Sequence, residues 1–161
     1  MKRYIVAGLV LVSMVFTGCD FFIDQIEVHN GLVVRSDKVA EAEVAFYDEY
    51  WALSEDADTS SFLTAYKDFS AAADDLEKYV NETKFSSRQT PIINEYNDYY
   101  KPVLDGYVEA AGALAAAVEK DGYNFDALES YFAPIDEYTV SFVSADDSFA
   151  AVTNALSDYS L

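Results

Sequence analysis

Apolar side chains recur every three or four residues along almost the whole chain beyond residue 24, and this spacing constrains the fold more than any other feature. It is typical of amphipathic helices, each with one apolar face directed to a common core. No run alternates with a period of two for long enough to form a strand. The sequence therefore predicts an all-α domain with four helical segments, at about Asp24–Leu53, Ser61–Thr83, Pro91–Gly122 and Asn124 to the chain end.

The first segment carries two neighbouring apolar stripes, which together predict a broad buried face. One stripe holds Ile26, Val33, Ala40, Val44, Tyr47 and Trp51, and the other holds Leu32, Val39, Phe46, Tyr50 and Leu53. The third segment carries a single stripe: Ile93, Tyr96, Tyr100, Val103, Tyr107, Ala111, Leu114 and Val118.

Turn and capping residues separate the four segments. Thr59 or Ser60 can cap the second helix, Thr90 followed by Pro91 predicts the start of the third, and Asn124 can cap the fourth. Pro102 and Pro134 interrupt the last two segments while the periodicity resumes on both sides, so each predicts a kink or a one-turn break. Short connections make neighbouring helices antiparallel, and an up-down-up-down four-helix bundle follows.

The first 18 residues have a different character from the rest of the chain. Lys2 and Arg3 precede an apolar run from Tyr4 to Phe16, which ends on Thr17 and Gly18. A short cationic start, an apolar stretch of about a dozen residues and a small-residue end make up a secretory signal. The apolar run is shorter than the roughly 20 residues that a membrane-spanning helix needs.

The end of this segment, Phe16-Thr17-Gly18-Cys19, resembles the lipobox of bacterial lipoproteins, with Phe16 where leucine is usual. The resemblance covers residues 1–19 and implies cleavage before Cys19, attachment of diacylglycerol to its thiol, and anchoring on the extracytoplasmic (periplasmic or cell-surface) face of the cell membrane. An ordinary thiol and an uncleaved anchor are the alternatives. Cys19 is the only cysteine, so no intramolecular disulfide competes for it. The chain then divides into a signal peptide (1–18) and one acidic domain (19–161).

The acidic balance excludes one class of partner. The chain has 29 acidic and 10 basic side chains, and removal of Lys2 and Arg3 with the signal moves its formal charge from −19 to −21. Such a chain is repelled by nucleic acids and by anionic membrane surfaces, so only the lipid on Cys19 is expected to hold it at a membrane. The acidity fits a basic partner or loosely held cations, and equally solubility or life in a salty medium.

Motifs of catalysis and of cofactor or metal binding are missing from the sequence. His29 is the only imidazole, Met1 and Met14 leave with the signal, and neither Gly-x-Ser-x-Gly nor a glycine-rich phosphate loop occurs. Asp56-Ala57-Asp58 begins like a calcium loop but lacks its later glycine and glutamate. Asp74-Asp75 and Asp146-Asp147 fall within helices, where solvated faces are expected. We therefore expect no enzyme, no cofactor and no metal site.

Tyrosine is the one unusual residue type, with 13 in the chain. Four of them lie in the third segment around Pro102: Tyr96, Tyr99, Tyr100 and Tyr107. Tyrosine has an apolar ring and a polar tip, so it suits helix boundaries as well as ligand or partner surfaces. The sequence predicts a binding or structural module of the cell envelope with an unknown protein or small-ligand partner. The alternative is a small-ligand or cation-binding lipoprotein that uses these four tyrosines.

Overall fold

A computed structural model describes the backbone of residues 2–157 and the side chains of residues 26–155. Its long helices are α1 (Lys2–Ala52), α2 (Ser60–Glu82), α4 (Lys101–Asp121) and α5 (Phe125–Ser157). Between α2 and α4 lie the 3-10 turn η1 (Ser87–Gln89), the short helix α3 (Thr90–Glu95) and the π-helical segment η2 (Tyr96–Tyr100). No strand occurs within residues 2–157, so the all-α prediction is confirmed.

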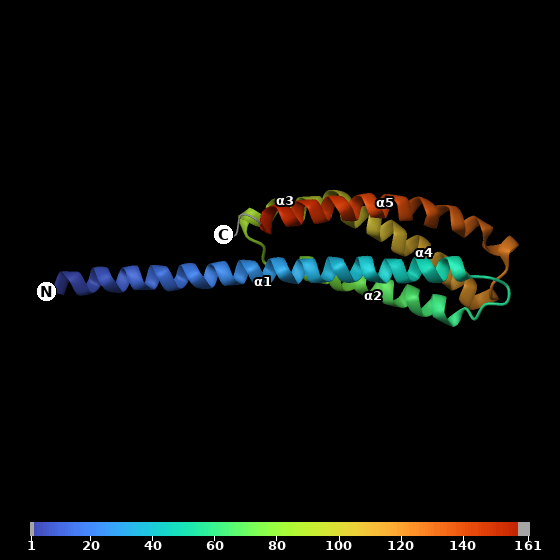
Figure 1. The fold of residues 1–161 in the computed structure, drawn as a ribbon, viewed down its shortest axis with the longest axis horizontal. Coiled ribbons are helices and arrows are strands. Elements are labelled where there is room, and N and C mark those ends of the chain that lie inside the picture. Colours follow the sequence, from blue (N-terminus) through green and yellow to red (C-terminus); the bar gives the residue numbers. More distant parts are fainter. Residues whose placement is uncertain (1, 158–161) are drawn as a thin grey trace.

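The helices form an elongated bundle in which successive long helices run in opposite directions (Figure 1). Helices α3, η2 and α4 follow one another without a gap and make up the third rod of the bundle. Contacts link α1 with α2, α2 with α4, α4 with α5, and α5 with α1, so the four rods enclose one core.

Aromatic rings fill the middle of this core. Phe46 of α1 lies 5.7 Å from Phe69 of α2 and 6.0 Å from Tyr107 of α4, measured between ring centroids. Phe142 of α5 closes the group at 5.9 Å from Tyr107. Edge-to-face and offset pairs of this kind add roughly 0.5–1.5 kcal/mol beyond the area they bury. All four rods thus contribute to one continuous core.

The prediction of a broad buried face on α1 is wrong for half of one of its two stripes, whereas Tyr47 of that stripe is half-buried against the core. Leu32, Val39 and Phe46 are almost fully buried. On the neighbouring stripe Ile26, Val44 and Trp51 are 45%, 57% and 66% exposed. Each helix of a four-rod bundle presents only its inward face to the core, and the Leu32 stripe fills that face on α1.

At two places in the third rod, the buried residue is the neighbour of the residue that was predicted to be buried. Ile92 and Leu104 are in the core, whereas Ile93 and Val103 are only partly buried. The reason is η2, in which the Lys101 N–H donates to the carbonyl of Tyr96, five residues earlier. A π-turn takes one more residue than an α-turn, so it keeps positions spaced by four on the inner face. The interruption expected near Pro102 is this wide turn.

Helix starts agree with the sequence at two of the predicted caps. Thr59 occupies the N-cap position of α2, although its side chain makes no capping hydrogen bond. Asn124 precedes α5, and its side-chain oxygen accepts the N–H of Ala127 at 3.3 Å, as predicted. Thr90 is instead the first residue of α3, and Gln89 occupies the N-cap position that was predicted for Thr90. Ser86 and Gln89 form a capping box around η1 in its place, with the Ser86 N–H 2.9 Å from the Gln89 oxygen.

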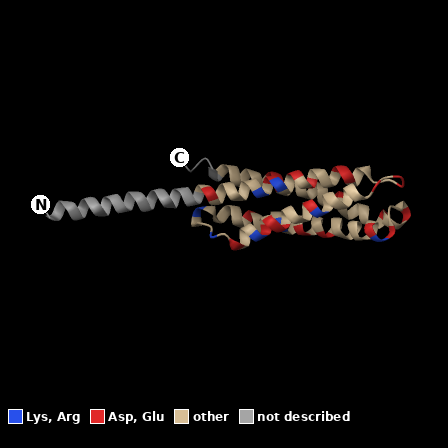
Figure 2. Cartoon of the chain, turned by 90° about the horizontal axis from the view of Figure 1, so that it is seen from below, with Lys and Arg blue, Asp and Glu red and all other residues tan. Residues whose placement is uncertain are grey.

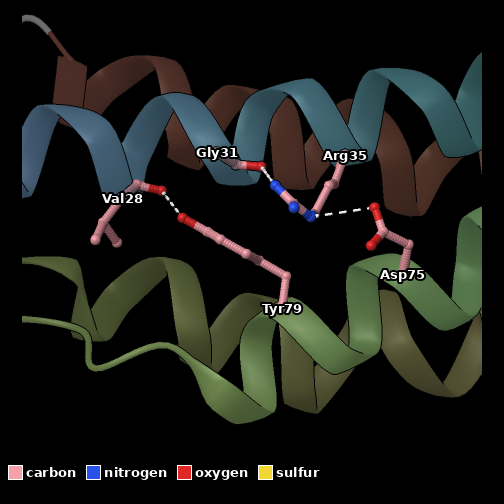
Figure 3. Close-up of polar contacts among 5 residues, drawn as sticks. All are labelled: Val28, Gly31, Arg35, Asp75 and Tyr79. Carbon is pink, nitrogen blue, oxygen red and sulfur yellow. Dashed lines mark hydrogen bonds and ion pairs between the residues drawn. The ribbon is translucent and has the colours of Figure 1, made fainter.

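Helices α1 and α2 are joined by polar contacts near the end of the bundle where the described side chains of α1 begin (Figure 3). The Tyr79 hydroxyl donates to the carbonyl of Val28 at 2.8 Å, and its ring lies against the backbone at Gly31, where any larger residue would clash. Arg35 stacks 4.1 Å from the centre of the Tyr79 ring and forms a 3.2 Å ion pair with Asp75. These contacts fix the lengthwise position of α1 on α2.

Candidate functional site

The four tyrosines singled out from the sequence do not share one surface. Tyr96, Tyr100 and Tyr107 are almost fully buried, with exposed fractions of 1% or less, whereas Tyr99 is 42% exposed. Tyr96 and Tyr100 stack on each other with ring centroids 6.0 Å apart. The cluster is therefore mainly part of the core, and only Tyr96 also borders a surface groove. The side chain of Cys19 lies outside the residues described.

A carboxylate that the sequence did not single out lies in the core among the aromatic rings. Glu43 of α1 accepts a 2.9 Å hydrogen bond from the Tyr107 hydroxyl, which is also 2.7 Å from the Thr139 hydroxyl. The Thr139 hydroxyl reaches the carbonyl of Ile135 at 2.9 Å. Burial raises the pKa of Glu43 against the opposing effect of the Tyr107 hydrogen bond, and the negative charge of Asp146 raises it further.

Asp146 of α5 lies close to this group and departs from the solvated role expected of it. It is half-buried beside the Tyr100 hydroxyl, which makes no hydrogen bond of good geometry. Burial and the neighbouring charge of Asp147 raise the pKa of Asp146. Glu43 and Asp146 thus form an interior pair of carboxylates that repel each other and favour protonation.

The sequence does contain a signal for both interior acids. Glu43 stands four residues after Val39 and three before Phe46, and so falls on the buried stripe of α1. Asp146 stands likewise between Phe142 and Phe149 on α5. An acidic residue at a core position of a helical stripe is the pattern to search for, because an isolated buried charge is strongly disfavoured unless the fold accommodates it.

A groove of about 380 Å³ lies on the outside of the bundle between α2 and α4. Its floor is apolar and aromatic, and its rims carry two carboxylates from each helix. The lining comprises Tyr66, Ala73, Asp74 and Glu77 on α2, Tyr96 on η2, and Leu104, Asp105, Val108, Glu109 and Gly112 on α4. At Gly112 an added Cβ would lie 2.7 Å from the Tyr66 hydroxyl, so the missing side chain leaves room for that ring.

One ammonium group already pairs with two carboxylates that line this groove. Lys101 pairs with Glu77 and with Asp105, at 2.8 Å in each case. Partial burial opposes its charge, but the hydrogen bonds to both carboxylates dominate and raise the pKa of Lys101. The buried hydroxyl of Tyr96 lies near these three charged groups and has no hydrogen-bond partner; burial raises its pKa to about 12. An unsatisfied buried hydroxyl is uncommon in folded proteins and calls for an explanation.

Acidic residues, coloured red, are spread along the whole described bundle, and basic residues, coloured blue, are fewer (Figure 2). Within the part whose side chains are described, no three acidic, histidine or cysteine side chains converge closely enough to hold one metal ion. Nor does any helix in the described part combine the length and apolar character needed to cross a membrane. Comparison of the chain with protein-family models, curated proteins and solved structures finds no match.

Proposed function

We propose that the chain is a lipid-anchored module of the bacterial cell envelope, held on the extracytoplasmic face of the membrane through Cys19. The observation that carries the proposal is the run Phe16-Thr17-Gly18-Cys19 after a short cationic and apolar segment. The formal charge of −21 after cleavage supports it, because an acidic surface gives no attraction to anionic lipids and leaves attachment to the lipid chain. Its role is binding or structural, without catalysis.

The position of the bundle in the sequence fits an anchor with a short reach. Ile26, where the described side chains of the bundle begin, is the seventh residue after Cys19. Even fully extended, seven residues span at most about 25 Å. The module is therefore held close to the membrane, at the end of the bundle where Tyr79 bonds to Val28.

The decisive experiment is metabolic labelling with a fatty-acid analogue in a bacterial host. The full chain should be labelled and found in membranes, and Cys19→Ser should abolish the label and release or misprocess the protein. Ser13→Cys in the Cys19→Ser background is a matched control, because it restores one thiol in the apolar run without the lipobox spacing. Label that persists in Cys19→Ser would refute the proposal.

A second role, binding of a small ligand or cation, is favoured by one observation. The groove between α2 and α4 is lined by Tyr96 of the tyrosine-rich third rod, and the buried hydroxyl of this residue has no hydrogen-bond partner. Grooves of about 300–1,000 Å³ with an apolar floor and a few placed polar groups are typical small-ligand sites.

A further inference from the structure

The groove between α2 and α4 has a composition that points to one class of ligand. Its four carboxylates come in two pairs, Asp74 and Glu77 on α2 and Asp105 and Glu109 on α4. Lys101 satisfies one carboxylate from each pair. The other two, Asp74 and Glu109, make no ion pair with any side chain that the structure describes. Two negative groups on opposite rims are therefore left for an incoming cation.

A second and independent feature of the groove is the Tyr96 hydroxyl. Tyr96 is 1% exposed, lines the groove, and its hydroxyl has no hydrogen-bond partner. A hydroxyl can accept a hydrogen bond from an ammonium group as well as donate one. Its position beside Lys101, Glu77 and Asp105 places an unused acceptor where alkylammonium chemistry is already present.

Lys101 itself shows what the site accommodates. Its side chain is a four-carbon aliphatic stem that ends in an ammonium group, and that group lies between carboxylates of α2 and α4. Leu104, Val108 and Ala73 supply apolar surface along the groove floor, against which methylene groups can pack. The groove thus offers apolar contact between charged rims.

We propose that this groove binds a linear aliphatic polyamine, with its ammonium groups at Asp74, Glu109 and the Tyr96 hydroxyl and its methylene chain along Leu104 and Val108. A divalent metal fits less well, because no three acidic groups of the described part converge on one point. The inference names the ligand class for the second role proposed above and rests on that role. It is independent of membrane anchoring, so failure of either leaves the other intact.

Isothermal titration calorimetry tests the proposal. Putrescine or spermidine is titrated into the full chain, purified in a non-ionic detergent at about 0.15 M NaCl. We expect saturable one-to-one binding, tighter for spermidine because it carries one more ammonium group. The neutral analogue 1,4-butanediol should not bind, and MgCl₂ should bind more weakly than spermidine. No binding of either amine at millimolar concentration would overturn the proposal, and so would tighter binding of Mg²⁺ or of a basic peptide.

A pair of charge-matched variants separates the groove from the general acidity of the chain. Asp74→Asn with Glu109→Gln should weaken spermidine binding by about tenfold or more, because each removes a charge-assisted hydrogen bond. Glu129→Gln with Glu137→Gln removes the same charge from exposed positions of α5 and should change affinity little. An equal loss in both double variants would show non-specific attraction and refute the site.

Two single substitutions should change spermidine affinity in ways that neither non-specific charge attraction nor misfolding would produce. Tyr96→Phe should weaken spermidine binding by about threefold, at the lower end of the value of one hydrogen bond, while melting temperature stays the same or rises. Lys101→Met should tighten binding, because it frees Glu77 and Asp105, and it should do so more than Lys120→Met, which removes one positive charge elsewhere. Unchanged affinity in Tyr96→Phe, or equal effects of the two lysine variants, would contradict the proposed geometry.

Discussion

A few polar atoms are buried in the core and lower the stability of the folded protein. The Glu43 carboxylate is held by the Tyr107 hydroxyl inside an aromatic cluster. The Tyr96 hydroxyl is buried without a hydrogen-bond partner, and the Tyr100 hydroxyl is buried beside Asp146 without a hydrogen bond of good geometry. Each such group raises the free energy of the folded state, since a buried polar atom loses its water without full replacement. A phenylalanine at either tyrosine position would fill nearly the same space without a buried oxygen, so the two hydroxyl groups lower the stability of the fold.

The raised pKa of Glu43 makes stability depend on pH. Its folded-state pKa lies above the ordinary value of 4.5, so the folded state binds the proton more tightly than the unfolded chain. Stability from this group is present at low pH and is lost as pH rises through the raised pKa. Glu43→Gln keeps an acceptor for Tyr107 without the charge, so it should stabilise the protein at pH 7 and flatten the fall in stability above pH 4.5.

Urea unfolding of the wild type and the variant between pH 4 and pH 8 measures this effect. Glu41→Gln, on the exposed face of the same helix, is the control and should leave the slope unchanged. A Glu43→Gln variant that is less stable than the wild type at pH 7 would show that the carboxylate is ionised and well satisfied in the core.

At the scale of one element, the π-segment η2 explains how a proline lies within the third rod. Pro102 has no N–H, and in an α-helix its ring would clash with the carbonyl of residue 98. The wide turn from Tyr96 to Tyr100 relieves that clash and takes one extra residue. The same turn directs both Tyr96 and Tyr100 inward, which brings the Tyr96 ring to the edge of the groove.

Deletion of one residue tests whether η2 holds one residue more than an ordinary α-turn. Removing Asp98, which is exposed, should convert η2 into an ordinary α-turn and keep all later side chains on their present faces. With Pro102 still present the α-turn is penalised, so Pro102→Ala should restore about 3 kcal/mol of stability in the deletion background. Deletion of Ala113, exposed in regular helix, should be far more damaging and should gain nothing from Pro102→Ala. Thermal unfolding by circular dichroism measures all three, and equal damage from both deletions would contradict the account.

Patterns of neighbouring residues predicted the helices, whereas the packing of one helix against another could not be predicted from the sequence. The helical segments and the Asn124 cap depend on neighbours within a few residues, and they could be predicted. The exception is the start of the first helix, which was predicted at about Asp24 and lies at Lys2. Which stripe of α1 faces inward depends on where α2 and α5 lie, so Val44 and Trp51 were wrongly placed in the core. The groove requires α2 and α4 to be neighbours, a tertiary pairing that no local pattern specifies.

Over the whole molecule, the acidic charge is the dominant long-range force. With 29 acidic and 10 basic side chains, self-repulsion destabilises the compact state. The screening length falls from about 30 Å at 0.01 M salt to about 3 Å at 1 M. The melting temperature of the full chain in non-ionic detergent should therefore rise with NaCl, alike for Na⁺ and K⁺, by about 2–4 °C for each kcal/mol recovered.

Calcium distinguishes screening from a specific metal site. Micromolar Ca²⁺ in excess NaCl should leave the melting temperature unchanged. At that concentration only an ion that binds tightly to a specific site would stabilise the fold, and we expect no such site. A clear rise would mean that carboxylates coordinate the ion, and would favour metal over amine in the groove.

The position of Trp51 has an optical consequence. It is the only tryptophan, and it lies in the last turn of α1 at 66% exposure. Its indole lies 5.6 Å from the Tyr50 ring and 6.0 Å from the Tyr47 ring. Light absorbed by the tyrosines can pass to this one indole, and the transfer weakens steeply with distance. Emission from Trp51 therefore reports on one end of the bundle, whereas the buried tyrosines absorb along its length. A change in the emission ratio would reveal helices that separate at that end before the rest of the molecule unfolds.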